Sequence, residues 1–117
     1  MKSKINNIGK IQKVICYYSK GLQNNGSHLI DLVINFFGPI HDIVVLKRKK
    51  NGIFIDVDLI LKTKITEVYI FSAHYKYFEI FEMDILGQKG RIEIKNNGTE
   101  VKIKKFKRSL RTKTSIV

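Results

Sequence analysis

The spacing of apolar residues most constrains the fold of this chain, because it has the period of a helix in only one long segment. A polar stretch at 21–26 reads as a loop. The apolar residues after it recur three and four positions apart, as on a helix with one buried face. They are Leu29, Leu32, Val33, Phe36 and Phe37. We predict one main helix here, with Asn25 or Ser27 as its N-cap and Gly38 and Pro39 as its stop signal.

Most of the remaining chain alternates with the two-residue period of β-strands. Asn97 and Gly98 suit the two positive-φ positions of a tight hairpin turn between the last two predicted strands. A strand, a helix and then a run of strands is an α+β order, which predicts a largely antiparallel open sheet with the helix packed on one face. The predicted strands cover residues 11–18, the alternating region from Ile43 through Lys62, and residues 65–73, 77–86, 91–95 and 99–106.

The length of 117 residues predicts one folded domain over residues 1–106, followed by a loose basic tail at 107–117. No apolar run reaches the roughly 20 residues of a membrane helix, and residues 1–10 lack the apolar core of a signal peptide, so we expect a cytoplasmic protein without membrane contact. Cys16, the single cysteine, has no disulfide partner within the chain. It alternates with Val14 and Tyr18, which favours a place in the core over a reactive thiol.

The chain carries 22 Lys and Arg against 10 Asp and Glu, a net charge of +12 that favours acidic partners. One functional alternative is therefore a basic module for nucleic acid or another anionic ligand. Its phosphate-binding surface would comprise 47–50 and 102–113, with Tyr69, Tyr75 and Tyr77 stacking on bases. Two simpler explanations remain: a compositional bias toward Lys, Ile and Asn, and lysines that form the solvent face of an edge strand.

Several common sites are not predicted. The eight glycines include no Gly-x-Gly-x-x-Gly sequence, so the chain has no Rossmann-type dinucleotide motif. The histidines, His28, His41 and His74, lack the His-x-x-x-His spacing of a zinc site, and a Cys-x-x-Cys pair needs a second cysteine. We therefore predict neither a cofactor site nor a metal site within this chain.

The most informative segment is 21–32, where a polar loop precedes a histidine in the first turn of the predicted helix. The partial positive charge at a helix N-terminus disfavours imidazolium, so His28 is a candidate proton acceptor near neutral pH. Asp31 follows at the spacing of a neighbour on the same helical face. The alternative is a histidine that only bonds to a cap or a loop carbonyl.

Two motifs of the sequence resemble motifs of a known enzyme family and occur in the same order as in that family. Residues 26–32, Gly-Ser-His-Leu-Ile-Asp-Leu, followed by Phe36-Phe37-Gly38, are similar to the Gly-x-His-x-Ile/Leu-Asp-Leu helix that opens the second domain of Gfo/Idh/MocA oxidoreductases. Residues 83–94 resemble that family's late strand, Gly-x-x-Gly turn and following strand. The resemblance covers about residues 11–106.

The resemblance implies a substrate-binding and oligomerisation domain of an NAD(P)-dependent oxidoreductase of sugars, cyclitols or nucleotide sugars. His28 matches the family's acid/base histidine, and the implied substrate-binding residues are Lys20, Asn24, Asn25 and Asp31. At the position of Asn24 the family often has aspartate; asparagine can bond to a hydroxyl but cannot stabilise His28 as a carboxylate would.

The family's Rossmann domain and its Glu-Lys-Pro segment do not occur in this sequence. We therefore expect a truncated or split chain that is inactive alone, with NAD(P) bound by a separately encoded Rossmann domain. The strands between Phe54 and Leu86 are more apolar than one helix can cover, which predicts a homodimer through a sheet face. A purely structural role in assembly is a third alternative.

Overall fold

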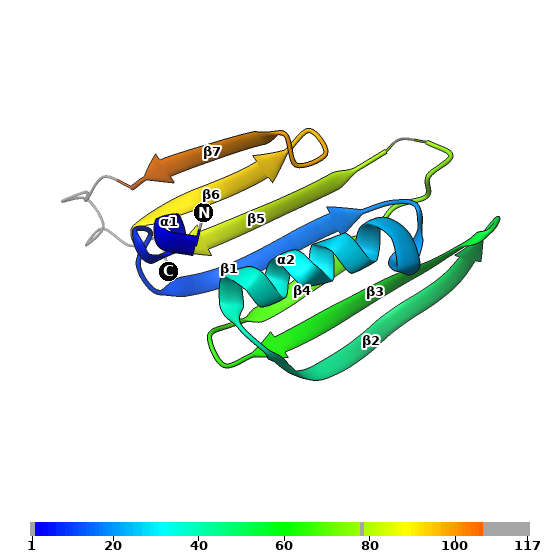
Figure 1. Ribbon diagram of the computed structural model, residues 1–117, viewed down its shortest axis with the longest axis horizontal. Helices are drawn as coiled ribbons and strands as arrows, with labels where there is room; N and C mark the ends of the chain where they lie inside the picture. The colour runs from blue at the N-terminus through cyan, green and yellow to red at the C-terminus, as the bar shows by residue number, and fades with distance from the viewer. Residues whose placement is uncertain (1, 78, 107–117) are drawn as a thin grey trace, which may run out of the picture.

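The computed structural model describes residues 2–77 and 79–106 and contains one sheet, with the main helix across one of its faces (Figure 1). In chain order the elements are α1 (Lys2–Asn6), β1 (Ile11–Tyr18), the π-helical turn η1 (Gly21–Gly26), α2 (Ser27–Phe37), β2 (Ile40–Asn51), β3 (Phe54–Thr63), β4 (Glu67–Ser72), β5 (Phe81–Gly87), β6 (Gly90–Lys95) and β7 (Glu100–Lys105).

The seven strands are ordered β2-β3-β4-β1-β5-β6-β7, so the first strand of the chain lies at the centre of the sheet (Figure 1). Val14 in β1 pairs with Val68 of the parallel strand β4 and with Ile85 of the antiparallel strand β5. All other neighbouring strands are antiparallel. Two antiparallel meanders, β2-β3-β4 and β5-β6-β7, are thus joined through β1, and the predicted α+β fold is confirmed.

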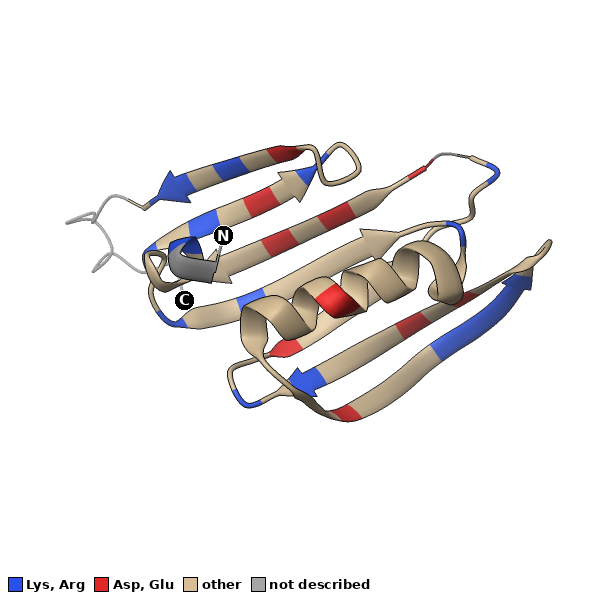
Figure 2. Ribbon diagram, in the orientation of Figure 1, with Lys and Arg blue, Asp and Glu red and all other residues tan. Residues whose placement is uncertain are grey.

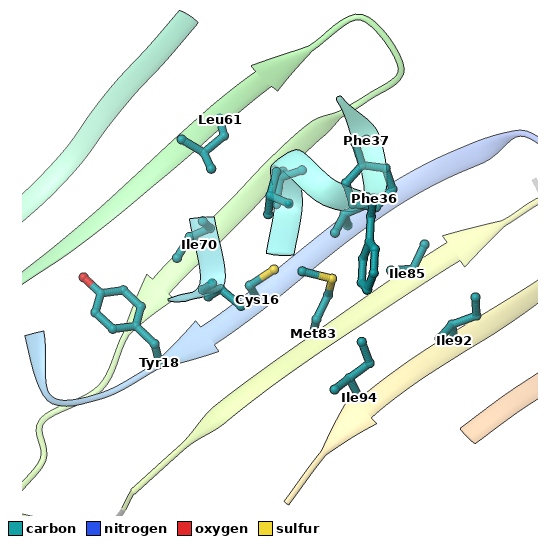
Figure 3. Packing of buried hydrophobic residues seen from close by; sticks show 14 of the residues in the cluster. Cys16, Tyr18, Phe36, Phe37, Leu61, Ile70, Met83, Ile85, Ile92 and Ile94 are labelled. Carbon is teal, nitrogen blue, oxygen red and sulfur yellow. The ribbon is translucent and has the colours of Figure 1, made fainter. Parts of the chain in front are cut away.

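The core lies between α2 and the central strands (Figure 3). The helix buries Leu29, Val33, Phe36 and Phe37, four residues of the predicted apolar face. Burial of one such side chain contributes roughly 1.5–3 kcal/mol, so packing against the sheet, more than intrinsic propensity, stabilises this helix. Cys16 is fully buried in the core as predicted, and burial raises the pKa of its thiol well above its usual value.

Several predicted strand boundaries were wrong. The strand predicted at 77–86 is Phe81–Gly87, and the one predicted at 65–73 is Glu67–Ser72. Ahead of β5 the chain turns: the Tyr77 amide donates to the His74 carbonyl at 3.2 Å, and the Lys76 amide donates to His74 Nδ1 at 3.0 Å. Aromatic residues in this turn mimicked a strand because they are common in sheets.

The hairpin turn between β6 and β7 was predicted correctly. Asn97 and Gly98 have φ values of 56° and 86°, and the Thr99 amide donates to the Asn96 carbonyl at 3.1 Å. Asn96 also has a positive φ, 52°, which the sequence did not predict. Both central residues therefore have the positive φ of a type I′ turn, whose twist matches that of the flanking strands. The turn places Asn97 beside the start of β5, where it contributes to the pocket described below.

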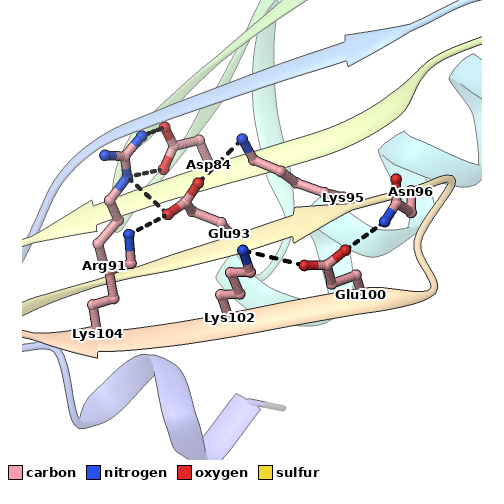
Figure 4. A network of polar contacts seen from close by, with 8 residues as sticks. All are labelled: Asp84, Arg91, Glu93, Lys95, Asn96, Glu100, Lys102 and Lys104. Carbon is pink, nitrogen blue, oxygen red and sulfur yellow. Dashed lines mark hydrogen bonds and ion pairs between the residues drawn. The ribbon is translucent and has the colours of Figure 1, made fainter.

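The sheet face opposite α2 has charged side chains over β5, β6 and β7 (Figure 4). Arg91 donates two hydrogen bonds to Asp84, at 2.8 and 2.6 Å. Glu93 lies among Arg91, Lys95 and Lys104, and its pKa is lowered, mainly by the hydrogen bond from Lys95. The lysines at this edge of the sheet are thus matched by carboxylates of the same surface.

An apolar stripe occupies the middle of the same open face. Its members are half-buried or exposed and come from five neighbouring strands. They are Ile15, Tyr17, Val44, Ile60, Tyr69, Phe71 and Leu86.

In the described part of the chain, no helix is both long and apolar enough to cross a membrane. The predicted basic tail at 107–117 lies outside the described residues.

Candidate functional site

The candidate site begins where β1 ends and the chain reverses into the helix. Lys20 and Gly21 have positive φ values of 65° and 83°, which produce the reversal. A Cβ atom on Gly21 would lie 3.0 Å from the Phe54 ring, so the turn is pressed against β3. The Gly21 amide donates to Asp56 Oδ1 at 3.1 Å, which fixes η1 to the same strand.

Tyr18, the last residue of β1, supports this turn from below. Its side chain is fully buried, and its hydroxyl donates to the Val57 carbonyl and accepts from the Val57 amide, both at 2.8 Å. Gly26 packs on the Tyr18 ring so closely that an added Cβ would be 3.2 Å from it. Burial is the main reason that the pKa of Tyr18 is raised to about 12.

The predicted loop at 21–26 and the predicted N-cap were both wrong. Residues 21–26 form η1, which runs directly into α2, and Gly26 itself is helical, with φ −61° and ψ −40°. Ser27 does not cap the helix; its Oγ donates to the Asn24 carbonyl at 2.7 Å. Glycine and asparagine have weak helix propensity, and the contacts with Tyr18 and β3 override it here. His28 therefore lies inside a continuous helical run, and the argument from an N-terminal dipole no longer applies to it.

His28 lines an open pocket of about 290 Å³ on the β5 side of the helix. Asn25 lines the same pocket from η1, Glu79 from the segment before β5, Phe81 from the first position of β5, and Asn97 from the β6–β7 turn. The His28 side chain is exposed and has no hydrogen bond to any other described residue. The alternative reading, in which His28 bonds to a cap or loop carbonyl, has no support among these contacts. Four polar side chains and one aromatic ring thus line this pocket.

The structure divides the predicted site residues between two sides of η1. Asn25 and His28 share the pocket just described, which we call the His28 pocket. Lys20 and Asn24 line a second pocket of about 210 Å³ on the β3 side. Asp31 is exposed on α2 and lines neither pocket. Lys20 connects the two sides, because its Nζ lies 3.3 Å from Oε1 of Glu79.

Sequence reasoning missed Glu79, Phe81 and Asn97 as residues of the His28 pocket. They lie more than 50 positions after His28 and follow from sheet topology: β5 pairs with β1, and the β6–β7 turn folds beside it. The alternating pattern around Glu79 in the sequence did not indicate that this residue lies near His28. Among residues 2–77 and 79–106, no group of three or more His, Cys, Asp and Glu side chains is placed to hold a metal ion.

The residues present do not fit a dinucleotide. In a Rossmann turn the first amides of the helix bind the pyrophosphate. Here the first amide of η1, that of Gly21, is occupied by the Asp56 carboxylate, and the Phe54 side chain packs against this glycine. This amide is therefore not free to bind a pyrophosphate, and the residues of the turn do not fit NAD(P) bound in the Rossmann manner.

No protein-family model matches the chain, and no curated protein matches it. Among solved structures, the fold is similar to the crystal structure of a "putative oxidoreductase" from Magnetospirillum magnetotacticum MS-1, with a TM-score of 0.69 and 16% sequence identity. The match covers 93% of this chain but 40% of the Magnetospirillum chain. At this identity the likeness establishes a shared fold: this chain has the architecture of a part of that larger protein.

Proposed function

We propose that this chain is the substrate-binding and oligomerisation domain of an oxidoreductase of the Gfo/Idh/MocA type that acts on a sugar, cyclitol or nucleotide sugar. The observation that carries the proposal is His28, which is exposed in a pocket with Asn25, Glu79 and Asn97 and has no partner among the described residues. The shared fold with part of the Magnetospirillum protein supports an oxidoreductase context.

In this proposal the residues of the His28 pocket divide the work of binding. Amide groups of Asn25 and Asn97 donate to and accept from ligand hydroxyls, and Phe81 offers an apolar surface to the C–H face of a ring. His28 exchanges a proton with the reacting hydroxyl. In this proposal NAD(P) and the hydride step are supplied by a separately encoded Rossmann domain.

The test is ligand binding by the purified chain. Calorimetry with neutral hexoses, cyclitols and nucleotide sugars should find a ligand whose affinity falls at least tenfold in His28→Ala and in Asn25→Ala, with the melting temperature nearly unchanged. His41→Ala, which changes an exposed histidine on β2, is the matched control. Equal affinity of His28→Ala and the wild type, or no binding from the whole panel at millimolar concentration, would contradict the proposal.

The oligomerisation part of the proposal concerns the apolar stripe of the open face. Tyr17 is 42% exposed and Leu86 38%, and they come from neighbouring strands at the centre of the sheet. A second copy of the chain can cover this stripe by an isologous contact. Sedimentation at micromolar concentration should show a dimer. The Leu86→Asp variant should be monomeric, whereas the control variant Ile53→Asp, on the exposed β2–β3 turn, should remain dimeric. A monomeric wild type would refute this part.

A further inference from the structure

A basic surface lies on the β3 side of η1, away from the His28 pocket. Arg48 and Lys50 pair across β2–β3 with Val57 and Ile55. Val57 belongs to the core beneath α2, so both cations are on the helix face of the sheet. They line a concavity of about 290 Å³ together with Ile55. Ile55 also lines the second pocket, so the two hollows adjoin.

We call this combined surface the basic groove. Its polar members come from the end of β1, from η1 and from β2. They are Lys20, Gln23, Asn24, Arg48 and Lys50. Within the described residues no Asp or Glu lines either hollow. The end of β2 stands out as a continuous basic segment in Figure 2.

Lys20 is paired with Glu79, but the charges of the two β2 cations of the groove are not neutralised as those elsewhere on the sheet are. At the β7 edge, Lys102 and Lys104 pair with Glu100 and Glu93 at 3.3 and 3.4 Å (Figure 4). In the described part of the chain, Arg48 and Lys50 have no carboxylate within ion-pair distance. A carboxylate of β3, Asp56, is already bonded to the Gly21 amide and to the Asn51 side chain.

The donors of the groove suit one chemical group. Arg48 presents a planar fork of N–H groups, and Lys50 and Lys20 present ammonium groups. The side-chain amides of Gln23 and Asn24 are exposed and make no hydrogen bond to other described residues. These donors, the unpaired charges of Arg48 and Lys50, and the absence of a described Asp or Glu from both linings favour an anion with many acceptor oxygens, that is, a phosphate or diphosphate.

We propose that the basic groove binds the phosphate or diphosphate group of a small phosphorylated molecule. A small ligand fits better than nucleic acid, because none of the described tyrosines that could stack on bases lines either hollow. The Tyr75 ring packs against the Phe54 ring, with 4.9 Å between the centroids. The proposal goes beyond the function assigned to the His28 pocket and does not depend on it, because Arg48 and Lys50, which supply the unpaired charges, do not line that pocket.

The experiment compares two double variants of the same strand. Arg48→Gln with Lys50→Gln removes two charges from the helix face, and Lys47→Gln with Lys49→Gln removes two charges from the opposite face. Calorimetry with inorganic pyrophosphate at 0.15 M salt should show at least tenfold weaker binding in the first variant and less than threefold weaker binding in the second. Thermal denaturation checks the fold, which these exposed positions should leave intact.

Further arms identify the ligand and the binding mode. Amide shifts of the wild type on addition of pyrophosphate should cluster at residues 20–24 and 48–55. Tighter binding of ADP than of glucose 1-phosphate assigns the groove to a nucleotide, and the reverse order assigns it to a sugar phosphate. The proposal is overturned if pyrophosphate shows no saturable binding at millimolar concentration, or if both double variants lose the same affinity for it. It is also overturned if a DNA oligonucleotide binds far more tightly than pyrophosphate and its affinity depends on all four cations, as binding along a nucleic-acid backbone requires.

Discussion

Replacement of Tyr18 by phenylalanine should destabilise the fold strongly although it removes a single oxygen atom. The hydroxyl is buried and makes two hydrogen bonds of 2.8 Å with the main chain of Val57. The pairing of β3 with β4 extends only to Leu59 and Ile70, so the Tyr18 hydroxyl bonds to main-chain groups of Val57 that lie beyond it. Without it, a buried N–H and a buried C=O lose their partner.

The expected cost follows from those two groups. An unsatisfied buried polar group costs about 1–3 kcal/mol, and the N–H tolerates the loss less well than the carbonyl. We therefore expect Tyr18→Phe to lower the free energy of unfolding by about 2–4 kcal/mol. For a chain of this size about 4 °C of melting temperature corresponds to each kcal/mol, which gives a decrease of about 8–16 °C.

Urea denaturation followed by circular dichroism measures this difference. The matched control is Tyr17→Phe, one position earlier on the same strand, whose hydroxyl makes no hydrogen bond to a described residue and whose ring keeps its contact with Phe71. We expect that control to stay within about 0.5 kcal/mol of the wild type. An equally small effect of Tyr18→Phe, at an unchanged dependence on urea, would refute the bridging role of the hydroxyl.

Three further predictions concern pH, reactivity and packing. The pKa of Tyr18 is raised to about 12 in the folded state and is about 10 in an unfolded chain, so the free energy of unfolding should fall as pH rises from about 10 to 12. Urea denaturation measured at a series of pH values should show a smaller fall for Tyr18→Phe. The Cys16 thiol is buried and its pKa is raised, so a thiol reagent such as DTNB should label it rapidly in denaturant. In buffer, labelling should proceed only at the rate of unfolding. Rapid labelling of the native protein would contradict the position of Cys16 in the core. Gly87→Ala puts a Cβ atom 2.3 Å from the Ile8 carbonyl oxygen and should cost about 2 kcal/mol or more by thermal denaturation, whereas a melting temperature equal to the wild type would mean that the chain at Ile8 moves freely.

Local pattern was sufficient to predict most elements of the fold. The helical spacing from Leu29 to Phe37 and the Asn97-Gly98 turn depend on nearby residues alone, and both predictions were confirmed. The helix start was not predictable in this way, because residues 21–26 are held in helical form by Tyr18 and Asp56, which lie on other elements. Tertiary contacts outweighed weak local propensity at that point.

The candidate site was predictable only on its helical side. Asn25 and His28 are close in sequence and share a pocket, but Asn24, their neighbour, faces the β3 side of η1. A π-helical turn rotates successive side chains differently from a loop or an α-helix, so sequence spacing could not separate the two sides. Glu79 could be assigned only once β5 was known to pair with β1, which is a long-range property of the sheet.

The central place of β1 has a consequence for how this protein is made. β1 leaves the ribosome before every other strand, yet its partners β4 and β5 come much later in the chain. The two meanders can form from neighbouring segments, but β1 must wait with both of its hydrogen-bonding edges unpaired. Such a strand is open to wrong partners during synthesis. Circular permutation that places β1 after β7 would remove this delay. The central strand would then be synthesised after β4 and β5, its two partners, are already present.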